Sequence, residues 1–345
     1  NICSKEYVVR QYDHEVQAQT IVKPLSGKWN DGPSDAGVLK PLEESWEGIV
    51  VSHGICPELS AFDSYLMAAN ALDEAMRNFV AVGGDPDYAA GLDNFCWCDP
   101  IESEKTPDGR YKLAQLVRAN KALYDYTHAY GVPLISGKDS MYNDYKIGGT
   151  KISILPTLLV SFIGKTPDVR KSVTLDVKQE GDLVYVIGVT AKELGGSEYY
   201  SLKQVEGGKA PSVDPNSITT YRKLHKAIHA GLVASCHDCS DGGLGVALAE
   251  KCIAGGLGMR IDLNKVPKKE EMRADELLFS ESASRFVVTV APDKKKTFEQ
   301  AMDGVILAEI GEVTGNALEV RDLNGITLSC GVTEMRDAWK KTLDW

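Results

Sequence analysis

The sequence predicts an α+β protein built from two domains, and three observations support this prediction. Segments with apolar residues at strand spacing alternate with segments at helical spacing, and several connections are short enough for hairpins. A chain of 345 residues is longer than one average domain. A polar, proline-containing segment at 164–172 lies near its middle. We therefore expect one domain at 1–172 and a second at 173–345.

The first half is expected to hold two long amphipathic helices among short strands. Asp63 can cap the first helix, and Gly83 and Gly84 can end it. Gly131 ends the second helix, and a polar loop at 137–140 is expected after the strand that follows. The predicted helices span 63–82 and 112–130, and the predicted strands lie at 6–11, 19–23, 35–39, 48–52, 88–97, 132–136 and 157–163.

The second half shows a similar alternation. It begins with a strand pattern at 183–188, and glycine-containing loops follow at 193–197 and 240–245. The other predicted strands lie at 258–263, 285–291, 304–310 and 326–330, and the predicted helices lie at 217–230, at about 244–254, at 268–279 and at 293–302.

Composition limits the functions that the chain can have. It is 43% hydrophobic and 25% charged, so it can bury substantial cores. Its formal net charge of −11 argues against nonspecific binding to nucleic acid or to an anionic membrane. No apolar run reaches the length of a membrane span, and the N-terminus lacks a signal-peptide core. We expect a cytoplasmic protein, and the first residue, Asn1 rather than Met, indicates a fragment or a processed chain.

Two oxygen-bearing side chains on the first long helix are candidates for binding a metal ion. Glu74 and Asn78 are one helical turn apart, so their side chains lie together on the helix surface. Small alanines around them leave room for a ligand, and a hard cation prefers oxygen ligands. The alternative is a solvated Glu and Asn on an exposed face.

Further polar residues stand where predicted strands end. Asp35, Asp93 and Asp238 are at such positions, next to small-residue loops at 32–37, 137–140, 193–197 and 240–245. Glycine allows backbone N–H groups to approach phosphate. No P-loop pattern and no protein-kinase signature set occurs. Taken with the acidic residues, the glycine loops favour a nucleotide–magnesium site.

The cysteines offer a competing interpretation. Cys96 with Cys98 and Cys236 with Cys239 could form a zinc site, and the second pair could be a redox pair. Their spacing is not that of a usual zinc finger, so buried, inert thiols are the preferred reading. A Ser/His/Asp hydrolase is disfavoured because no Gly-x-Ser-x-Gly motif occurs, and we expect His237 to be a positioned loop residue and not a general base.

Seven ordered motifs resemble one enzyme family, phosphoribosylformylglycinamidine synthase, and more narrowly the second of its two homologous halves. The resemblance extends from residue 8 to about residue 332. The motifs are YDHEVQ at 12–17, GPSDA at 32–36, DEAMRN at 73–78, LDNFCW at 92–97, ISGKDSM at 135–141, ELGGSE at 193–198 and HDCSDGGL at 237–244.

The resemblance implies a fold and a reaction. The wider family, which includes aminoimidazole ribonucleotide synthase, combines an N-terminal domain whose sheet pairs with a homologous sheet into a barrel with a C-terminal α/β sandwich. ATP phosphorylates the amide oxygen of formylglycinamide ribonucleotide, and ammonia then displaces phosphate. By motif, magnesium would be held by Asp35, Glu74, Asn78 and Asp238, and the nucleotide, ATP or ADP, would be contacted by Ser34 and Ser240.

The resemblance also implies that this half lends residues to a neighbouring active site. By position these are Asp93 and Gly137 near the nucleotide, and Lys138 and Ser140 near the substrate. Compact family members usually have Asn where Lys138 stands, and a lysine cannot ligate magnesium; the long single-chain members share the Gly-Lys-Asp-Ser sequence. The catalytic histidine belongs to the first half, so no catalytic residue is expected in this chain.

The expected partners are therefore the first half of the synthase and a glutaminase that supplies ammonia. An isolated half is expected to form a homodimer in place of the missing pairing. Two alternatives remain open at this point: a non-catalytic half with a structural Mg-ADP, and a small-molecule kinase of the same superfamily.

Overall fold

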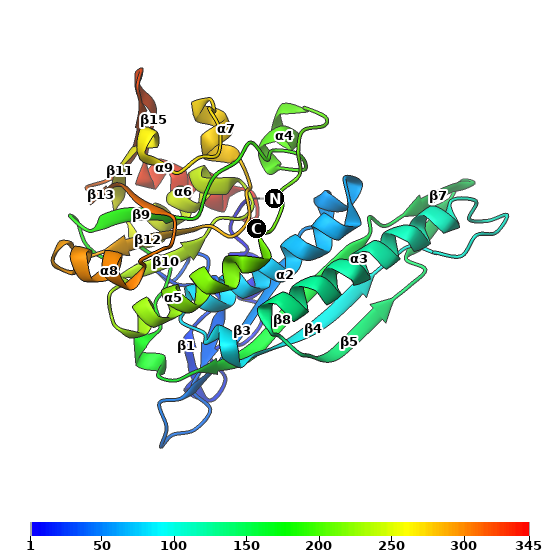
Figure 1. Cartoon of the computed structure of the whole chain (residues 1–345), viewed down its shortest axis with the longest axis horizontal. Coiled ribbons are helices and arrows are strands. Elements are labelled where there is room, and N and C mark those ends of the chain that lie inside the picture. Colours follow the sequence, from blue (N-terminus) through cyan, green and yellow to red (C-terminus); the bar gives the residue numbers. More distant parts are fainter. Residues whose placement is uncertain (1, 345) are drawn as a thin grey trace.

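The computed structural model describes residues 2–344 and contains two large β-sheets, each covered by helices (Figure 1). The first sheet has six strands in the order β1-β2-β3-β8-β4-β5. Neighbouring strands are antiparallel except for the parallel pair β4 and β5. The strands span Thr20–Val22 (β1), Gly37–Leu39 (β2), Gly48–Ile55 (β3), Ala89–Cys96 (β4), Leu134–Ser140 (β5) and Thr157–Thr166 (β8).

Two long helices, α2 (Ser64–Ala81) and α3 (Gly109–Tyr130), lie side by side along this sheet, as expected (Figure 1). The Asp63 carboxylate caps α2 by accepting the N–H of Tyr65 at 2.8 Å, and Gly83 follows the helix with a φ of +98°. Helix α2 packs against β3 and β8 on one side and also contacts β10 of the second sheet. It therefore lies between the two sheets, and this position brings its polar residues close to the second domain.

The second sheet has seven strands in the order β10-β12-β9-β13-β11-β14-β15. All neighbours are antiparallel except β11 and β14. The strands span Leu183–Ile187 (β9), Ser235–Asp238 (β10), Gly258–Asp262 (β11), Phe286–Val290 (β12), Leu307–Thr314 (β13), Ala317–Asp322 (β14) and Gly325–Gly331 (β15). The helices span Glu198–Lys203 (α4), Ile218–His229 (α5), Gly243–Gly255 (α6), Ala274–Phe279 (α7), Lys295–Ala301 (α8) and Val332–Lys341 (α9).

The side chains of β9 alternate between two hydrophobic cores, as expected for a strand covered on both faces. Val184 and Val186 pack with residues of α6, α7 and α9. Tyr185 and Ile187 belong to a core that also contains α2, α3, α5 and the first sheet. The two sheets thus share one continuous core, which fixes the residues at their junction.

A short two-stranded hairpin stands apart from both sheets. Its strands are β6 (Asp144–Ile147) and β7 (Thr150–Ser153), which pair only with each other. Figure 1 shows it at the end of α3 that is farthest from the second sheet.

The segment predicted as a strand at 6–11 is a helix instead, α1 (Glu6–Val9). The Glu-Tyr-Val-Val sequence has strand propensity, but here it has no strand partner, and Arg10 pairs with Glu6 one turn away. The polar loop predicted at 137–140 is also wrong: these residues continue β5, because Gly137 and Lys138 pair with Asp93 and Asn94 of β4.

Element boundaries in the second half differ from the prediction as well. Only the last part of the helix predicted at 268–279 forms, as α7, and the strand predicted at 304–310 begins later, as β13. The elements α4, β6, β7, β10, β14 and α9 were not predicted. Within residues 2–344, none of the helices has both the length and the apolar composition that a membrane crossing needs.

Candidate functional site

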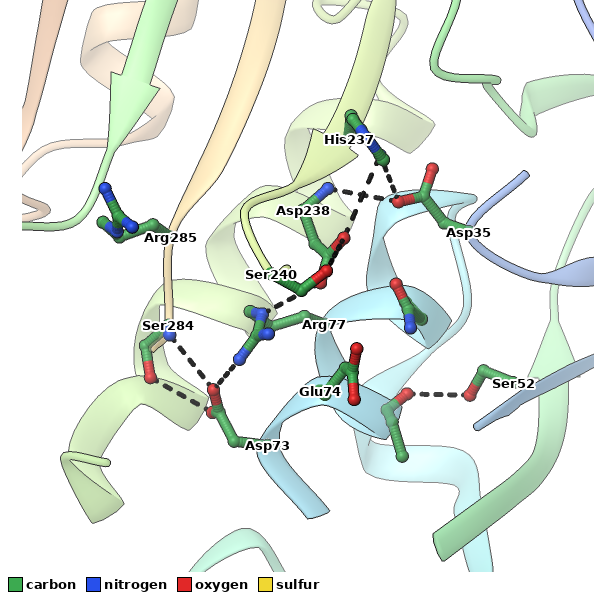
Figure 2. Close-up of polar contacts among 12 residues, drawn as sticks. Asp35, Ser52, Asp73, Glu74, Arg77, His237, Asp238, Ser240, Ser284 and Arg285 are labelled. Carbon is green, nitrogen blue, oxygen red and sulfur yellow. Dashed lines mark hydrogen bonds and ion pairs between the residues drawn. The ribbon is translucent and has the colours of Figure 1, made fainter. Parts of the chain in front are cut away.

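Three buried side chains from distant parts of the chain meet where the two domains join. Strand β10 delivers His237 and Asp238 at its end, and the loop before β2 delivers Asp35 (Figure 2). One ligand atom from each lies within 4.8 Å of the other two. This is the only such group of His, Cys, Asp or Glu side chains among residues 2–344. The structure thus brings together two of the four predicted metal ligands and adds a histidine.

The hydrogen bonds of Asp35 leave one oxygen free to bind a cation. Its Oδ1 accepts the backbone N–H of Asp238 at 3.1 Å and lies 2.7 Å from Nδ1 of His237. Its Oδ2 and the Oγ of Ser34 are buried and have no hydrogen-bond partner among the described residues. Unpaired buried oxygen atoms are costly unless a ligand satisfies them. The oxygen donors here fit a hard cation such as magnesium.

His237 is held between two carboxylates. Its Nδ1 faces Asp35, and its Nε2 lies 3.0 Å from Oε2 of Glu250. Burial alone would lower the pKa of His237, but the charges of Asp35 and Glu250 outweigh it and raise the pKa well above its ordinary value. The imidazolium therefore balances acidic charge beside Asp35. His237 was expected in a loop, but it lies in strand β10, where the pairing of residues 235–238 with β12 holds it.

Glu74 and Asn78 both form hydrogen bonds with backbone groups of strand β3. Neither belongs to the cluster of Asp35, His237 and Asp238. The Glu74 carboxylate accepts the N–H of Ile55 at 2.7 Å, and the Asn78 amide donates to the carbonyl of His53 at 2.9 Å. Burial, together with the charge of Asp238, raises the pKa of Glu74 to about 8. Glu74 is therefore an electrostatic neighbour of the cluster.

Arg77, which the sequence reasoning missed, links the helix to the cluster (Figure 2). Its Nε donates to Oδ2 of Asp238 at 3.2 Å, and its Nη1 donates to Asp73. Both carboxylates are buried, so Arg77 supplies the positive charge that they need. A signal was present in the sequence: Asp73 and Arg77 are four residues apart on a helix that is otherwise largely apolar.

Asp73 itself joins several elements. Its carboxylate accepts the hydroxyl of Tyr130 at 2.6 Å, the hydroxyl of Tyr221, and the N–H and Oγ–H of Ser284 at 3.0 and 3.1 Å. These partners come from α3, from α5 and from the segment before β12. The network fixes α2, and with it Arg77, relative to the second domain.

Two cavities meet beside the cluster. One, of about 240 Å³, is lined by Glu74, Arg77 and Glu281, and by Gly196 of the predicted glycine loop. The other, of about 600 Å³, is lined by Ser34, Asp35, His53 and Trp339. Ser240 and Asp241 line both cavities. A ligand that spans the two cavities would therefore pass directly beside the cluster.

The smaller cavity is strongly acidic. Burial, together with neighbouring carboxylates that include Glu198, raises the pKa of Glu281 to about 8 and that of Asp241 to about 6. A cation bound in this cavity would relieve the repulsion among these carboxylates.

The remaining predicted site residues form a separate group on the strand pair β4–β5. Asp93 lies opposite Gly137, where a Cβ atom would lie 2.6 Å from Oδ1 of Asp93, so only glycine fits without a shift. Lys138 contacts Ser140 through Nζ and Oγ on the same strand. Strand β5 is the edge strand at the opposite end of the sheet from β1 and β2. The structure therefore keeps these four residues away from Asp35.

The four cysteines that offered a zinc alternative are all unpaired. Burial raises the pKa of the Cys98, Cys236 and Cys239 thiols, which disfavours the thiolate that binds zinc. Among the described residues, the one candidate ligand group contains no cysteine.

Comparison with known proteins finds relatives that match nearly the whole chain. Residues 179–322 match the family described as "AIR synthase related protein, C-terminal domain". The phosphoribosylformylglycinamidine synthase subunit PurL of Thermoplasma acidophilum is 32% identical over 345 residues, which is 100% of this chain and 43% of the relative. The chain thus spans less than half the length of that relative.

Solved structures of PurL from Thermotoga maritima share the fold. The structure of its complex with FGAR has a TM-score of 0.72 at 19% identity, and the match covers 92% of this chain and 50% of that chain. The structure of its complex with ATP has a TM-score of 0.67 at 20% identity, and the match covers 98% of this chain and 52% of that chain. The two mixed sheets with their helices are therefore an α+β architecture of the PurL type.

Proposed function

The chain is a homologue of PurL in the AIR synthase-related family, and from this premise we propose that it is the second half of a phosphoribosylformylglycinamidine synthase. Such an enzyme converts formylglycinamide ribonucleotide to its amidine with ATP and ammonia. The seven sequence motifs and the identity to a PurL over the full chain support the assignment. The nucleotide and substrate named for the two T. maritima structures support ATP and FGAR as ligands of the assembled enzyme.

In this proposal the cluster of Asp35, His237 and Asp238 is the nucleotide–magnesium site. Asp35 and Asp238 would hold magnesium, with Glu74 and Asn78 completing the set from α2, and magnesium would neutralise phosphate charge there. Ser34 and Ser240 would contact the nucleotide. The observation that carries this assignment is the buried, unpaired Oδ2 of Asp35 beside the Asp238 carboxylate.

We assign the group on β4 and β5 to the neighbouring active site. Strand β5 is exposed and forms one edge of its sheet, so Lys138 and Ser140 can reach a substrate held by another half. Asp93 and Gly137 would lie near the nucleotide of that site. The catalytic histidine would come from the first half. Two separate sites would explain why the residues on β4 and β5 lie far from the cluster of Asp35, His237 and Asp238.

The assembly we propose contains the first half of the synthase and a glutaminase that supplies ammonia in the cytoplasm, where the eight unpaired cysteines would stay reduced. The domains are assigned to 1–172 and 173–345. In the absence of the first half, the chain would form a homodimer through the outer face of the first sheet. Val51, Ile55 and Ile163 expose 42%, 42% and 37% of their surface on that sheet.

A structural role for the bound nucleotide is the second candidate. The cluster joins the loop before β2 to β10, and Arg77 joins α2 to the same strand, so Mg-ADP held there would bind the domains together. Under this alternative the nucleotide would stay bound and unreacted during turnover. A small-molecule kinase has no comparable observation in its favour.

The test is stabilisation of the chain by Mg-ADP and by Mg-ATP, measured as the shift in melting temperature. A ligand at about 100 times its Kd stabilises the folded state by about 2.7 kcal/mol. We expect such a shift for the wild-type chain, and we expect Asp35→Asn and Glu74→Ala to abolish most of it.

Glu319→Gln, at a partly exposed position on β14, is the control and should respond like wild type. Melting of the wild-type chain that does not change with either nucleotide at saturation would contradict the assignment. Retention of ADP through a complete turnover cycle of the assembled enzyme would favour the structural role over the catalytic one.

A further inference from the structure

The β6–β7 hairpin turns its apolar side chains towards solvent and its polar side chains towards the protein, which is the reverse of a normal surface hairpin. Tyr145 lies opposite Ile152 across the strand pair, and Ile147 lies two residues further on the same face. These three side chains expose 66%, 54% and 58% of their surface. The apolar face of the hairpin therefore points away from the protein.

The polar face of the hairpin is the one that is held against the chain. The buried Lys112 of α3 donates to Oγ of Ser153 at 2.9 Å, and Oδ2 of Asp144 accepts the N–H of Asp99 at 2.8 Å. Lys151 donates to Oγ1 of Thr106 at 3.0 Å. Three separate anchors thus fix the orientation of the hairpin, so the outward direction of its apolar face follows from the structure around it.

A two-stranded sheet with an exposed apolar face is only marginally stable in water, because nothing buries that face. Contiguous exposed apolar side chains that include an aromatic ring are typical of protein interfaces. The hairpin also follows directly on β5, the edge strand that carries Lys138 and Ser140. A partner on the hairpin would therefore lie beside these two residues.

We propose that the apolar face of the β6–β7 hairpin, formed by Tyr145, Ile147 and Ile152, is a docking surface for the first half of the synthase. This inference rests on the proposed function, because it takes Lys138 and Ser140 as residues that serve the first half. The chain matches 43% of one PurL and 50% of another, so a further half of comparable size belongs to the complete enzyme. That half is the partner that must approach β5, and the hairpin is the apolar surface next to it.

The experiment measures the affinity of the full 345-residue chain for the separately produced first half of the synthase from the same source, by sedimentation velocity. The test variant is Tyr145→Ser with Ile152→Ser, which leaves the anchoring contacts of Lys112, Asp144 and Ser153 intact. We expect binding at least about tenfold weaker than wild type, because a buried aromatic anchor dominates the energy of many interfaces. Thermal unfolding of the variant alone should match wild type.

The matched control is Leu323→Ser with Ile326→Ser on the β14–β15 hairpin, where the two side chains expose 89% and 60% of their surface. This variant should bind like wild type. As a second measurement, amides at 144–153 should exchange more slowly with solvent when the first half is added, and amides at 317–331 should not change.

Equal affinity of the test variant and wild type would overturn the proposal, as would the absence of any binding by the wild-type chain. A variant that loses only self-association would show that a second copy covers the hairpin, which also overturns it. Failure of the proposed function would look different. In that case the two halves would associate through the hairpin, and the assembly would lack ATP-dependent ligase activity.

Discussion

At the scale of single residues, the buried carboxylates of the site outnumber the buried cations that pair with them. Asp35, Asp73 and Asp238 are buried carboxylates, and the chain offers them Arg77 and His237 as cations. Glu74 keeps a raised pKa although the charge of Arg77 acts to lower it, because Arg77 is paired with Asp73 and Asp238. A buried acid without a cation is tolerated only if it is protonated or if a metal supplies the charge. The residual acidity is thus a physical reason for the site to bind a divalent cation.

Glu281 offers a test of this acidity away from the cluster. Its carboxylate accepts the N–H groups of Gly242 and Glu198 at 2.8 and 2.9 Å, and burial raises its pKa from 4.5 to about 8. The folded chain therefore binds this proton more tightly than the unfolded chain, and stability is lost as the pH rises from about 4.5 towards 8. Glu281→Gln keeps a hydrogen-bond acceptor and removes the charge.

We expect Glu281→Gln to match wild type in urea unfolding at pH 4.5 and to be more stable by about 2 kcal/mol at pH 8.5, a value reduced for the partial exposure of the carboxyl group. Glu43→Gln, at an exposed position, should show no such difference between the two pH values. A Glu281→Gln variant that is less stable than wild type at pH 8.5 would contradict this, because it would mean that contacts of the charged carboxylate outweigh the cost of burying it.

The sequence predicted Asp35 and Asp238 as site residues because both are acidic and stand at junctions between regular elements and loops of small residues. It could not predict the Arg77–Asp238 ion pair or the contact of His237 with Asp35. These contacts join residues 161 and 202 positions apart, and only the packing of the two domains brings them together.

At the scale of elements, α2 carries Glu74, Arg77 and Asn78 of the site. Its extent was predictable because the apolar period, the Asp63 cap and the glycines after it all agree. Strand β5 was mistaken because Gly-Lys-Asp-Ser has low strand propensity, and pairing with β4 overrides that preference. The hairpin at 144–153 escaped prediction because its apolar residues face outward and carry no core signal.

Gly54 sets the distance between α2 and β3. A Cβ atom there would lie 2.1 Å from the carbonyl oxygen of Ala71 and 2.6 Å from the backbone nitrogen of Ala75. Gly54→Ala should therefore push α2 away from the sheet, lower the free energy of unfolding by about 2 kcal/mol or more, and weaken Mg-ADP binding by moving Glu74.

Gly331→Ala is the control for Gly54→Ala. Its Cβ would meet nothing within 4 Å, and its φ of −67° suits alanine, so it should not be destabilised. Urea unfolding and nucleotide titration would measure both variants. Unchanged stability of Gly54→Ala would mean that the helix can shift at little cost.

At the scale of the whole molecule, one core runs from the first sheet through α2 to one face of the second sheet. The predicted division into α+β halves captured the two sheets, but it did not anticipate this shared core. Hydrophobic patterns identify which side chains are buried, yet they do not say which elements those side chains pack against. For this reason the relation of the two sheets, and the site between them, could not be derived from the sequence.

The separation of the two groups of site residues leads to the last prediction. Asp35 and Asp238 lie at the junction of the domains, whereas Lys138 and Ser140 lie on the exposed edge of the first sheet. Phosphoryl transfer to an amide needs metal-bound ATP, a positioned substrate and a group that manages protons at one place. In this chain the proposed metal ligands and the proposed substrate-binding residues lie at two separate places. We therefore expect little or no turnover of formylglycinamide ribonucleotide with ATP and ammonia by the chain alone.

Addition of the first half should restore turnover, measured as ATP-dependent formation of the amidine. In that assembly Ser140→Ala should raise KM for formylglycinamide ribonucleotide by about tenfold and change kcat less, because one hydrogen bond to a charged group contributes about 1.5 kcal/mol. Ser329→Ala, on the exposed strand β15, should leave both constants unchanged. Rapid turnover by the isolated chain would place the complete active site within these 345 residues and would remove the need for a second half.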